Sequence, residues 1–86
     1  MAEYDVVDVK PVGPSRLAVT FADGLRGEVE LRESFLHGVF EVLADPSVFA
    51  KVSCEQGFVE WPDDLDLAPD AMHRAIKERG VWLLGS

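Results

Sequence analysis

The sequence predicts a small α+β domain in which an antiparallel sheet packs against two short helices. Three observations predict this class: apolar residues alternate with polar ones in the first segments, they recur at helical spacing in two later segments, and Gly, Pro and Asp separate the segments. Strands that run together, with helices set apart from them, are typical of α+β folds. The chain has 86 residues, which is the size of one domain. We expect a three-stranded N-terminal meander plus a C-terminal hairpin.

Strands are expected at residues 6–12, 16–21 and 25–31, because side chains on a strand alternate between two faces. In the first of these segments, Val7 and Val9 are expected to share a face. The apolar face of the second strand would comprise Leu17, Val19 and Phe21, and that of the third strand Leu25, Val29 and Leu31.

Register predicts the turn between the second and third strands. A two-residue loop would place charged residues of the third strand on the core face, because strand side chains alternate with period two. A three-residue loop over residues 22–24 instead pairs Phe21 with Leu25. It also pairs Leu17 with Val29. The glycine that ends this loop would take the left-handed position of a bulged turn.

The first helix is expected at residues 34–44. Ser34 is its predicted N-cap, because a Ser side chain can accept a hydrogen bond from a free backbone N–H. A short helical turn should follow, with Asp45 as its cap and Pro46 at its first position. The apolar positions that match the helical template are Leu36, Val39, Phe40 and Leu43.

Two short strands are expected at residues 51–54 and 58–61, joined by a hairpin turn at 55–57. Pro62 should end the second of these strands, because proline has no N–H for a strand ladder.

The last helix is expected at residues 69–79, and Gly80 is a typical C-terminal cap for it. Residues 81–86 form an apolar C-terminal tail, which must pack back on the domain or onto a second subunit. The inner face of the helix would comprise Met72, Ala75 and Ile76.

Charge narrows the classes of partner. The formal net charge is −8 and the sequence pI is about 4.5. Because nucleic-acid affinity depends on neutralising phosphates, we expect no nucleic-acid binding by the chain on its own. Arg74, Lys77 and Arg79 are better explained as cations near a helix C-terminus than as a nucleic-acid patch. A basic protein partner fits this charge balance.

The sequence also carries signals of location. No apolar run approaches the roughly 20 residues that a bilayer span requires. The acidic N-terminus lacks the apolar segment of a secretory signal. Cys54 is the single cysteine, which fits a reducing compartment. We therefore expect a cytoplasmic protein that does not bind membranes.

The stretch between Trp61 and Asp70 is the densest in carboxylates. Such oxygen ligands could hold calcium or magnesium, but the spacing lacks the Gly and the closing Glu of an EF-hand loop. Carboxylates before and within the first turn of a helix also complement the positive end of its dipole, and we favour this interpretation. We expect neither a metal ion nor a cofactor. The carboxylates concerned are Asp63, Asp64, Asp66 and Asp70.

No catalytic residues are predicted. His37, His73 and Cys54 lack the spacing of a zinc motif. A Cys–His nucleophile pair would need a base beside Cys54, and a cysteine in a strand is typically buried and inert. A small hydrolase or ligand-binding domain that uses Cys54 and a histidine remains one alternative.

Several short motifs occur in a fixed order: Asp23-Gly24, Glu30-Leu31, Gly38-Val39-Phe40, Leu43, Asp45-Pro46, Phe49, Gly57, Trp61-Pro62 and Asp66-Leu67-Ala68-Pro69-Asp70. In their order and spacing, the chain resembles a small bacterial family, the domain-of-unknown-function family 2442, over most of its length. The resemblance implies an α+β fold similar to the N-terminal domain of a nitrosomonad protein of that class. It implies no catalytic residues. Because such proteins are often encoded beside another small protein, it implies an antitoxin-like binding role.

Two positions depart from the family pattern. The family usually has Asn-Gly after Trp-Pro, where this chain has Asp63-Asp64, and a turn with positive φ is harder without Gly. The family often has an acidic residue before the second proline, where this chain has Ala68, a poor N-cap.

These observations favour a non-enzymatic protein-interaction module that binds a basic protein partner. The predicted partner-binding residues are Asp63, Asp64, Asp66 and the aromatic Trp82. The second alternative is a homo-oligomeric structural or accessory domain, such as a homodimer joined through the apolar tail.

Overall fold

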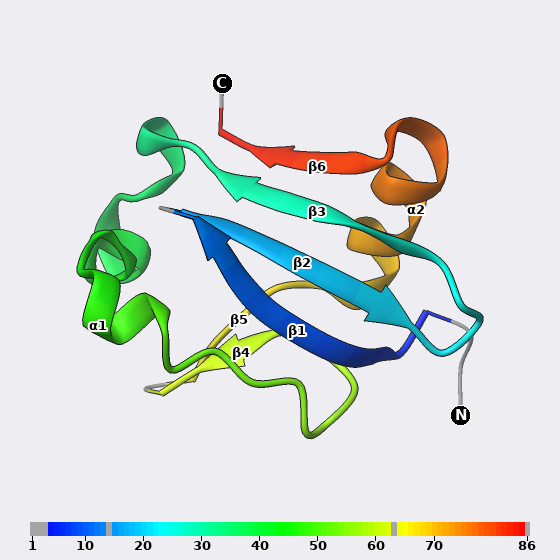
Figure 1. Cartoon of the computed structure of the whole chain (residues 1–86). Coiled ribbons are helices and arrows are strands. Elements are labelled where there is room, and N and C mark those ends of the chain that lie inside the picture. Colours follow the sequence, from blue (N-terminus) through cyan, green and yellow to red (C-terminus); the bar gives the residue numbers. More distant parts are fainter. Residues whose placement is uncertain (1–3, 14, 63, 86) are drawn as a thin grey trace.

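A mixed four-stranded sheet, a small two-stranded sheet and short helices make up the part of the chain that the computed structural model describes, residues 4–13, 15–62 and 64–85 (Figure 1). The four strands lie in the order β1-β2-β3-β6, and β4 pairs with β5. This arrangement confirms the predicted α+β class. In chain order the elements are β1 (Val6–Gly13), β2 (Arg16–Phe21), β3 (Arg26–Leu31), the 3-10 helices η1 (Glu33–Phe35) and η2 (Gly38–Ala44), α1 (Pro46–Phe49), β4 (Glu60–Trp61), β5 (Leu65–Asp66), α2 (Pro69–Arg79) and β6 (Val81–Leu84).

The β2–β3 hairpin has the predicted three-residue loop. Leu17 lies opposite Val29, and the backbone N–H of Phe21 donates to the carbonyl of Leu25 at 2.8 Å. Gly24 has a φ of 91°, which is the left-handed conformation that the bulged turn requires. The register therefore buries one face of both strands, as predicted.

The prediction for β1 was wrong in one respect. Val7 does not share the inner face with Val9, because a bulge between Val6 and Asp8 inserts an extra residue opposite β2. Val6 is buried, whereas Val7 is 51% exposed.

The single helix predicted at residues 34–44 is also wrong. The segment forms two 3-10 helices, η1 and η2. Gly38, the first residue of η2, has a φ of 58°, so the backbone cannot continue as one right-handed helix from η1 through this position. Ser34 consequently lies inside η1 instead of capping a helix. Leu43 is buried, and Leu36 and Phe40 are half-buried against the core.

The short helix α1 begins as predicted. Asp45 is its N-cap, and a side-chain oxygen of Asp45 accepts a hydrogen bond from the backbone N–H of Ser47 at 2.9 Å. Pro46 occupies the first turn, where a missing N–H costs nothing, and Phe49 is buried.

The predicted hairpin between residues 51–54 and 58–61 is reduced to one bridge. Ser53 and Glu60 exchange two backbone hydrogen bonds of 2.9 Å, but no ladder continues from them among the described residues. Instead β4 turns back after Pro62 and pairs with β5, Trp61 lying opposite Leu65. The hairpin is thus displaced toward the C-terminus, because Trp61 and Leu65 both bury their side chains on one face.

The last helix, α2, has the predicted bounds and the predicted buried residues Met72 and Ile76. Gly80, with a φ of 78°, ends it and redirects the chain. The apolar tail then packs back on the domain as β6, which runs parallel to β3 and extends the predicted meander to four strands (Figure 1).

One hydrophobic core joins the inner face of the large sheet to α1, α2 and the β4–β5 pair. The buried apolar residues are Val6, Leu17, Val19, Phe21, Val29, Leu31, Leu43, Phe49, Val59, Trp61, Leu65, Leu67, Met72 and Ile76. Within the described residues, no helix has both the length and the apolar character needed to cross a bilayer.

Candidate functional site

Buried apolar side chains anchor the β4–β5 hairpin, which carries several acidic residues. The Trp61 side chain is only 3% exposed, and its indole N–H donates to the backbone carbonyl of Phe49 at 3.0 Å. Leu65 and Leu67 are also buried, and the backbone N–H of Leu67 donates to the carbonyl of Val59. Because strand side chains alternate, these apolar anchors direct the intervening acidic residues away from the core.

Glu60, Asp64 and Asp66 together form what we call the acidic hairpin. Glu60 and Asp66 are direct partners across the β4–β5 pair. Side chains in such a pair lie roughly 4.5–5.5 Å apart at Cβ, and like charges placed there destabilise a sheet. Asp64 lies in the turn with a φ of 62°. The turn thus takes the left-handed conformation even though this chain has no glycine there.

No cation of the described residues neutralises this hairpin. The ion pairs in residues 4–13, 15–62 and 64–85 all lie elsewhere, on the β2–β3 strands, at Arg32 and at His73. A groove of about 340 Å³ runs beside the acidic hairpin, and its walls include Phe58 and Pro62. The site therefore offers unneutralised carboxylates in a mostly polar groove that is also lined by Phe58 and Pro62.

Asp70 and Asp63 are the other two members of the predicted carboxylate cluster. Asp70 is exposed in the first turn of α2, where its charge complements the helix dipole. Asp63 lies outside the described residues.

Trp82 lies far from the acidic hairpin. It is on β6, at the edge of the large sheet, whereas β4 and β5 lie across the molecule (Figure 1). Its side chain is half-buried and packs against the core. The structure therefore does not bring Trp82 together with Asp64 and Asp66 as one surface.

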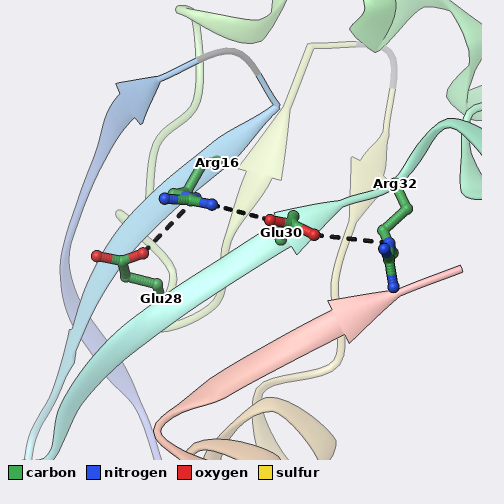
Figure 2. Close-up of polar contacts among 4 residues, drawn as sticks. All are labelled: Arg16, Glu28, Glu30 and Arg32. Carbon is green, nitrogen blue, oxygen red and sulfur yellow. Dashed lines mark hydrogen bonds and ion pairs between the residues drawn. The ribbon is translucent and has the colours of Figure 1, made fainter. Parts of the chain in front are cut away.

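Four charged side chains form a ladder on the sheet face that points away from α2. Arg16 contacts Glu30 at 2.9 Å and Glu28 at 3.7 Å, and Glu30 also contacts Arg32 at 3.6 Å (Figure 2). The hydrogen bond from Arg16 to Glu30 raises the pKa of Arg16, and the charge of Glu28 adds to this effect. Sequence reasoning did not identify this ladder, although the predicted register places Arg16 opposite Glu30.

A groove of about 460 Å³ lies on the same sheet face. Both Asp8 and Lys10 contribute to it from β1, and both Arg26 and Glu28 from β3. Because the two signs of charge alternate across it, this groove selects no class of charged ligand. The acidic hairpin is more selective, because its charges share one sign.

Cys54 and the histidines lie in separate environments. Burial raises the pKa of the Cys54 thiol, and the nearby charges of Asp8 and Glu55 raise it further. His73 Nε2 instead lies 2.8 Å from Asp23 Oδ2, and its ring packs edge-on against Phe21. In the described part of the chain, no hydrogen bond or ion pair joins Cys54 to a histidine.

The described residues contain no group of three or more His, Cys, Asp or Glu side chains arranged to hold a metal ion.

The family described as "Protein of unknown function (DUF2442)" matches residues 6–78. The chain belongs to this family. The match covers every element from β1 through most of α2 and leaves β6 outside it. No curated protein and no solved structure matches the chain. The acidic hairpin lies wholly within the matched residues.

Proposed function

We propose that this protein is a non-enzymatic, cytosolic interaction module that binds a basic protein partner through the acidic hairpin. The observation that carries this proposal is the direct opposition of Glu60 and Asp66 without a neutralising cation among the described residues. Opposed carboxylates destabilise the free hairpin, and a cation from a partner would relieve their repulsion.

The groove beside the hairpin favours a protein partner. Lys and Arg side chains combine a long apolar stem with a charged head. The apolar walls at Phe58 and Pro62 suit the stem, while the carboxylates of Asp64 and Asp66 suit the head, which a guanidinium could engage with two hydrogen bonds. An exposed arginine or lysine segment of the partner is therefore the proposed ligand.

The biological role that fits this binding is antitoxin-like. Family resemblance implies a gene arrangement in which a second small protein is encoded alongside. An acidic module that covers the basic surface of that protein would keep it from nucleic acid or another anionic target, because both ligands compete for the same cations.

The experiment compares two triple variants of equal charge. Glu60→Gln, Asp64→Asn and Asp66→Asn remove the acidic hairpin, whereas Glu33→Gln, Glu41→Gln and Glu78→Gln remove three exposed carboxylates elsewhere. Binding of the separately purified adjacent gene product is to be measured by surface plasmon resonance, which gives both the affinity and the association rate. The hairpin variant should lose at least about tenfold in affinity, and the control should change mainly the association rate.

Stability gives an independent readout that needs no partner. Glu60→Gln alone should stabilise the free protein by roughly 0.2–1 kcal/mol, because it removes the repulsion from Asp66. If Glu60→Gln makes the protein more stable but weakens its affinity for the partner, the pair of carboxylates serves binding at the expense of stability. Absence of any complex, or equal weakening by both triple variants, would refute the proposal.

A further inference from the structure

The outer edge of β6 is an open strand edge. Among the described residues, β6 is the last strand in the sheet order and pairs with β3 alone (Figure 1). The Val81–Leu84 segment is wholly apolar, and Leu83 is 45% exposed. Exposed edges of this kind are templates for pairing with another strand.

The ladder with β3 determines which backbone groups point outward. The N–H of Arg32 donates to the carbonyl of Leu84, and the N–H of Glu28 donates to the carbonyl of Gly80. Because hydrogen-bonding direction alternates along a strand, the even-numbered residues of β6 face β3. The N–H and C=O groups of Val81 and Leu83 therefore face the open edge.

Side-chain direction alternates with the same period. Trp82 and Leu84 pack against the core, so Val81 and Leu83 project on the opposite face of the sheet. Two adjacent copies of β6 would thus bring together apolar side chains on both faces.

The other edge of the sheet carries the usual protection against pairing. β1 has two register irregularities, one of them beside Pro11, and the backbone N–H of Val6 is occupied by the carbonyl of Gly57. Lys10 and Asp8 add charges to that strand. The contrast singles out β6 as the edge suited to pairing.

We propose that β6 pairs antiparallel with β6 of a second copy of this chain, so that two four-stranded sheets join into one. In the two-fold register, Trp82 lies opposite Trp82 of the other copy, and Val81 lies opposite Leu83. This register uses all four outward backbone groups of each strand, and it is isologous, so that it closes after two copies.

Charges at the ends of the strand complement this arrangement. The α2 terminus with Arg79 precedes β6, and Gly85, which follows β6, lies against Ser34 and Phe35 of η1. In an antiparallel pair, Arg79 of one copy approaches the η1 segment of the other, where Glu33 is exposed. Neither Arg79 nor Glu33 forms an ion pair within the described residues.

A joint of four-residue strands buries a small area, so we expect a weak dimer with a Kd of roughly 10–100 μM. Sedimentation equilibrium from about 5 to about 500 μM should resolve its monomer and dimer. Leu83→Lys places a charge beside the joint, opposite Glu30 of β3, and leaves the backbone hydrogen bonds between β3 and β6 in place. It should raise the Kd at least about tenfold. Val12→Lys is the matched control: Val12 is 46% exposed on the protected β1 edge, and this variant should leave the Kd unchanged.

A spectroscopic measurement on the unsubstituted chain tests the register without any variant. Two Trp82 indoles side by side should give an exciton band in circular dichroism that grows with the dimer fraction. A monomer at every concentration, assembly beyond the dimer, a dimer without this band, or equal effects of the two lysine variants would each overturn the proposal.

Discussion

Burial determines the chemistry of Cys54. The side chain is half-buried beside the start of β1, and its pKa lies above the ordinary value because of desolvation and the charges of Asp8 and Glu55. The thiolate is the reactive form of cysteine, so a raised pKa makes the residue less reactive near neutral pH. This environment is the opposite of an activated nucleophile.

We therefore predict slow alkylation of Cys54. Iodoacetamide should modify the folded protein more slowly than the urea-unfolded protein at neutral pH, because less thiolate is present. The pH at which the rate reaches half its maximum should lie above the ordinary cysteine value. Mass spectrometry of quenched samples measures the rate, with Cys54→Ser as the blank, and equal rates for both states would contradict the prediction.

Single residues differ in how readily sequence revealed their roles. Asp45 and Gly24 were predictable, because a cap and a left-handed turn depend on their nearest neighbours. The contact between His73 and Asp23 was not, since the two residues are 50 positions apart. Nothing local in the sequence distinguishes His73 from a solvent-exposed histidine.

At the scale of secondary-structure elements, β3 and α2 lie in close contact at Gly27. A Cβ added at Gly27 would lie 2.4 Å from Ile76 Cγ2 and 2.8 Å from the carbonyl oxygen of Gly80. The second of these is backbone that ends α2, so it cannot yield without moving the helix. Gly27 thus permits α2 to lie directly on the sheet.

Gly27→Ala should consequently destabilise the protein by about 1–3 kcal/mol, because an added methyl overpacks the contact. Gly13→Ala is the control, since nothing lies within 4 Å of a Cβ at that position. Urea unfolding followed by tryptophan fluorescence measures both. Equal stability of the two variants would show that the helix can shift without cost.

The N-terminus of α2 lacks a side-chain cap. Ala68 is the N-cap residue, and it accepts no hydrogen bond from the helix through its side chain. Ala68→Asp should stabilise the protein by about 0.5–2 kcal/mol, because the carboxylate can accept from a free N–H and complement the dipole. Ala68→Ser, which adds a cap without charge, separates capping from repulsion by Asp66 and Asp70. Thermal melts that show no gain for either variant would argue against this cap position.

Secondary structure was predictable where one pattern dominates. Register alone gave the β2–β3 loop, and Pro69 at the start with Gly80 at the C-cap marked the bounds of α2. The single helix predicted at residues 34–44 was wrong because the spacing of the apolar residues fits a helix, whereas Gly38 takes a positive φ that this spacing does not reveal. The main partner of β4 was predicted wrongly: Glu60 bridges Ser53 on one side, as expected, but it also pairs with Asp66 of β5 on the other, and no local pattern marked residues 65–66 as a strand.

The stability of the whole molecule depends on pH through two carboxyl groups whose pKa is lowered in the folded protein, those of Asp23 and Asp45. The hydrogen bond from His73 and the Leu25 backbone N–H lower the pKa of Asp23, which ties the β2–β3 turn to α2. Hydrogen bonds from the hydroxyl and backbone N–H of Ser47 lower the pKa of Asp45. Both groups favour the folded state in their ionised form.

The sign of the pH dependence follows from these shifts. Below the ordinary Asp pKa of about 3.9, the unfolded chain binds protons that the folded chain resists, so stability should fall as pH drops through that value. Urea unfolding at about pH 7, 5 and 3 measures the decline. Asp23→Asn should decline less steeply over this range, and an equally steep decline would remove Asp23 as a cause.

The acidic site was predictable in part. The density of carboxylates around residues 63–70 indicated the right region, but the opposition of Glu60 and Asp66 depends on a strand pairing that sequence did not reveal. Trp82 was predicted to bind the partner together with these carboxylates because it is aromatic, but its position on β6 separates it from the acidic hairpin.

The parallel pairing of β6 with β3 also bears on the order of folding. The first three strands meet through turns of a few residues, whereas β6 reaches β3 only when a loop of roughly fifty residues closes, which costs more chain entropy and slows contact formation. The fourth strand should therefore dock last in refolding. Trp82, carried on that strand, would report this final step, while Trp61 reports consolidation around the β4–β5 pair.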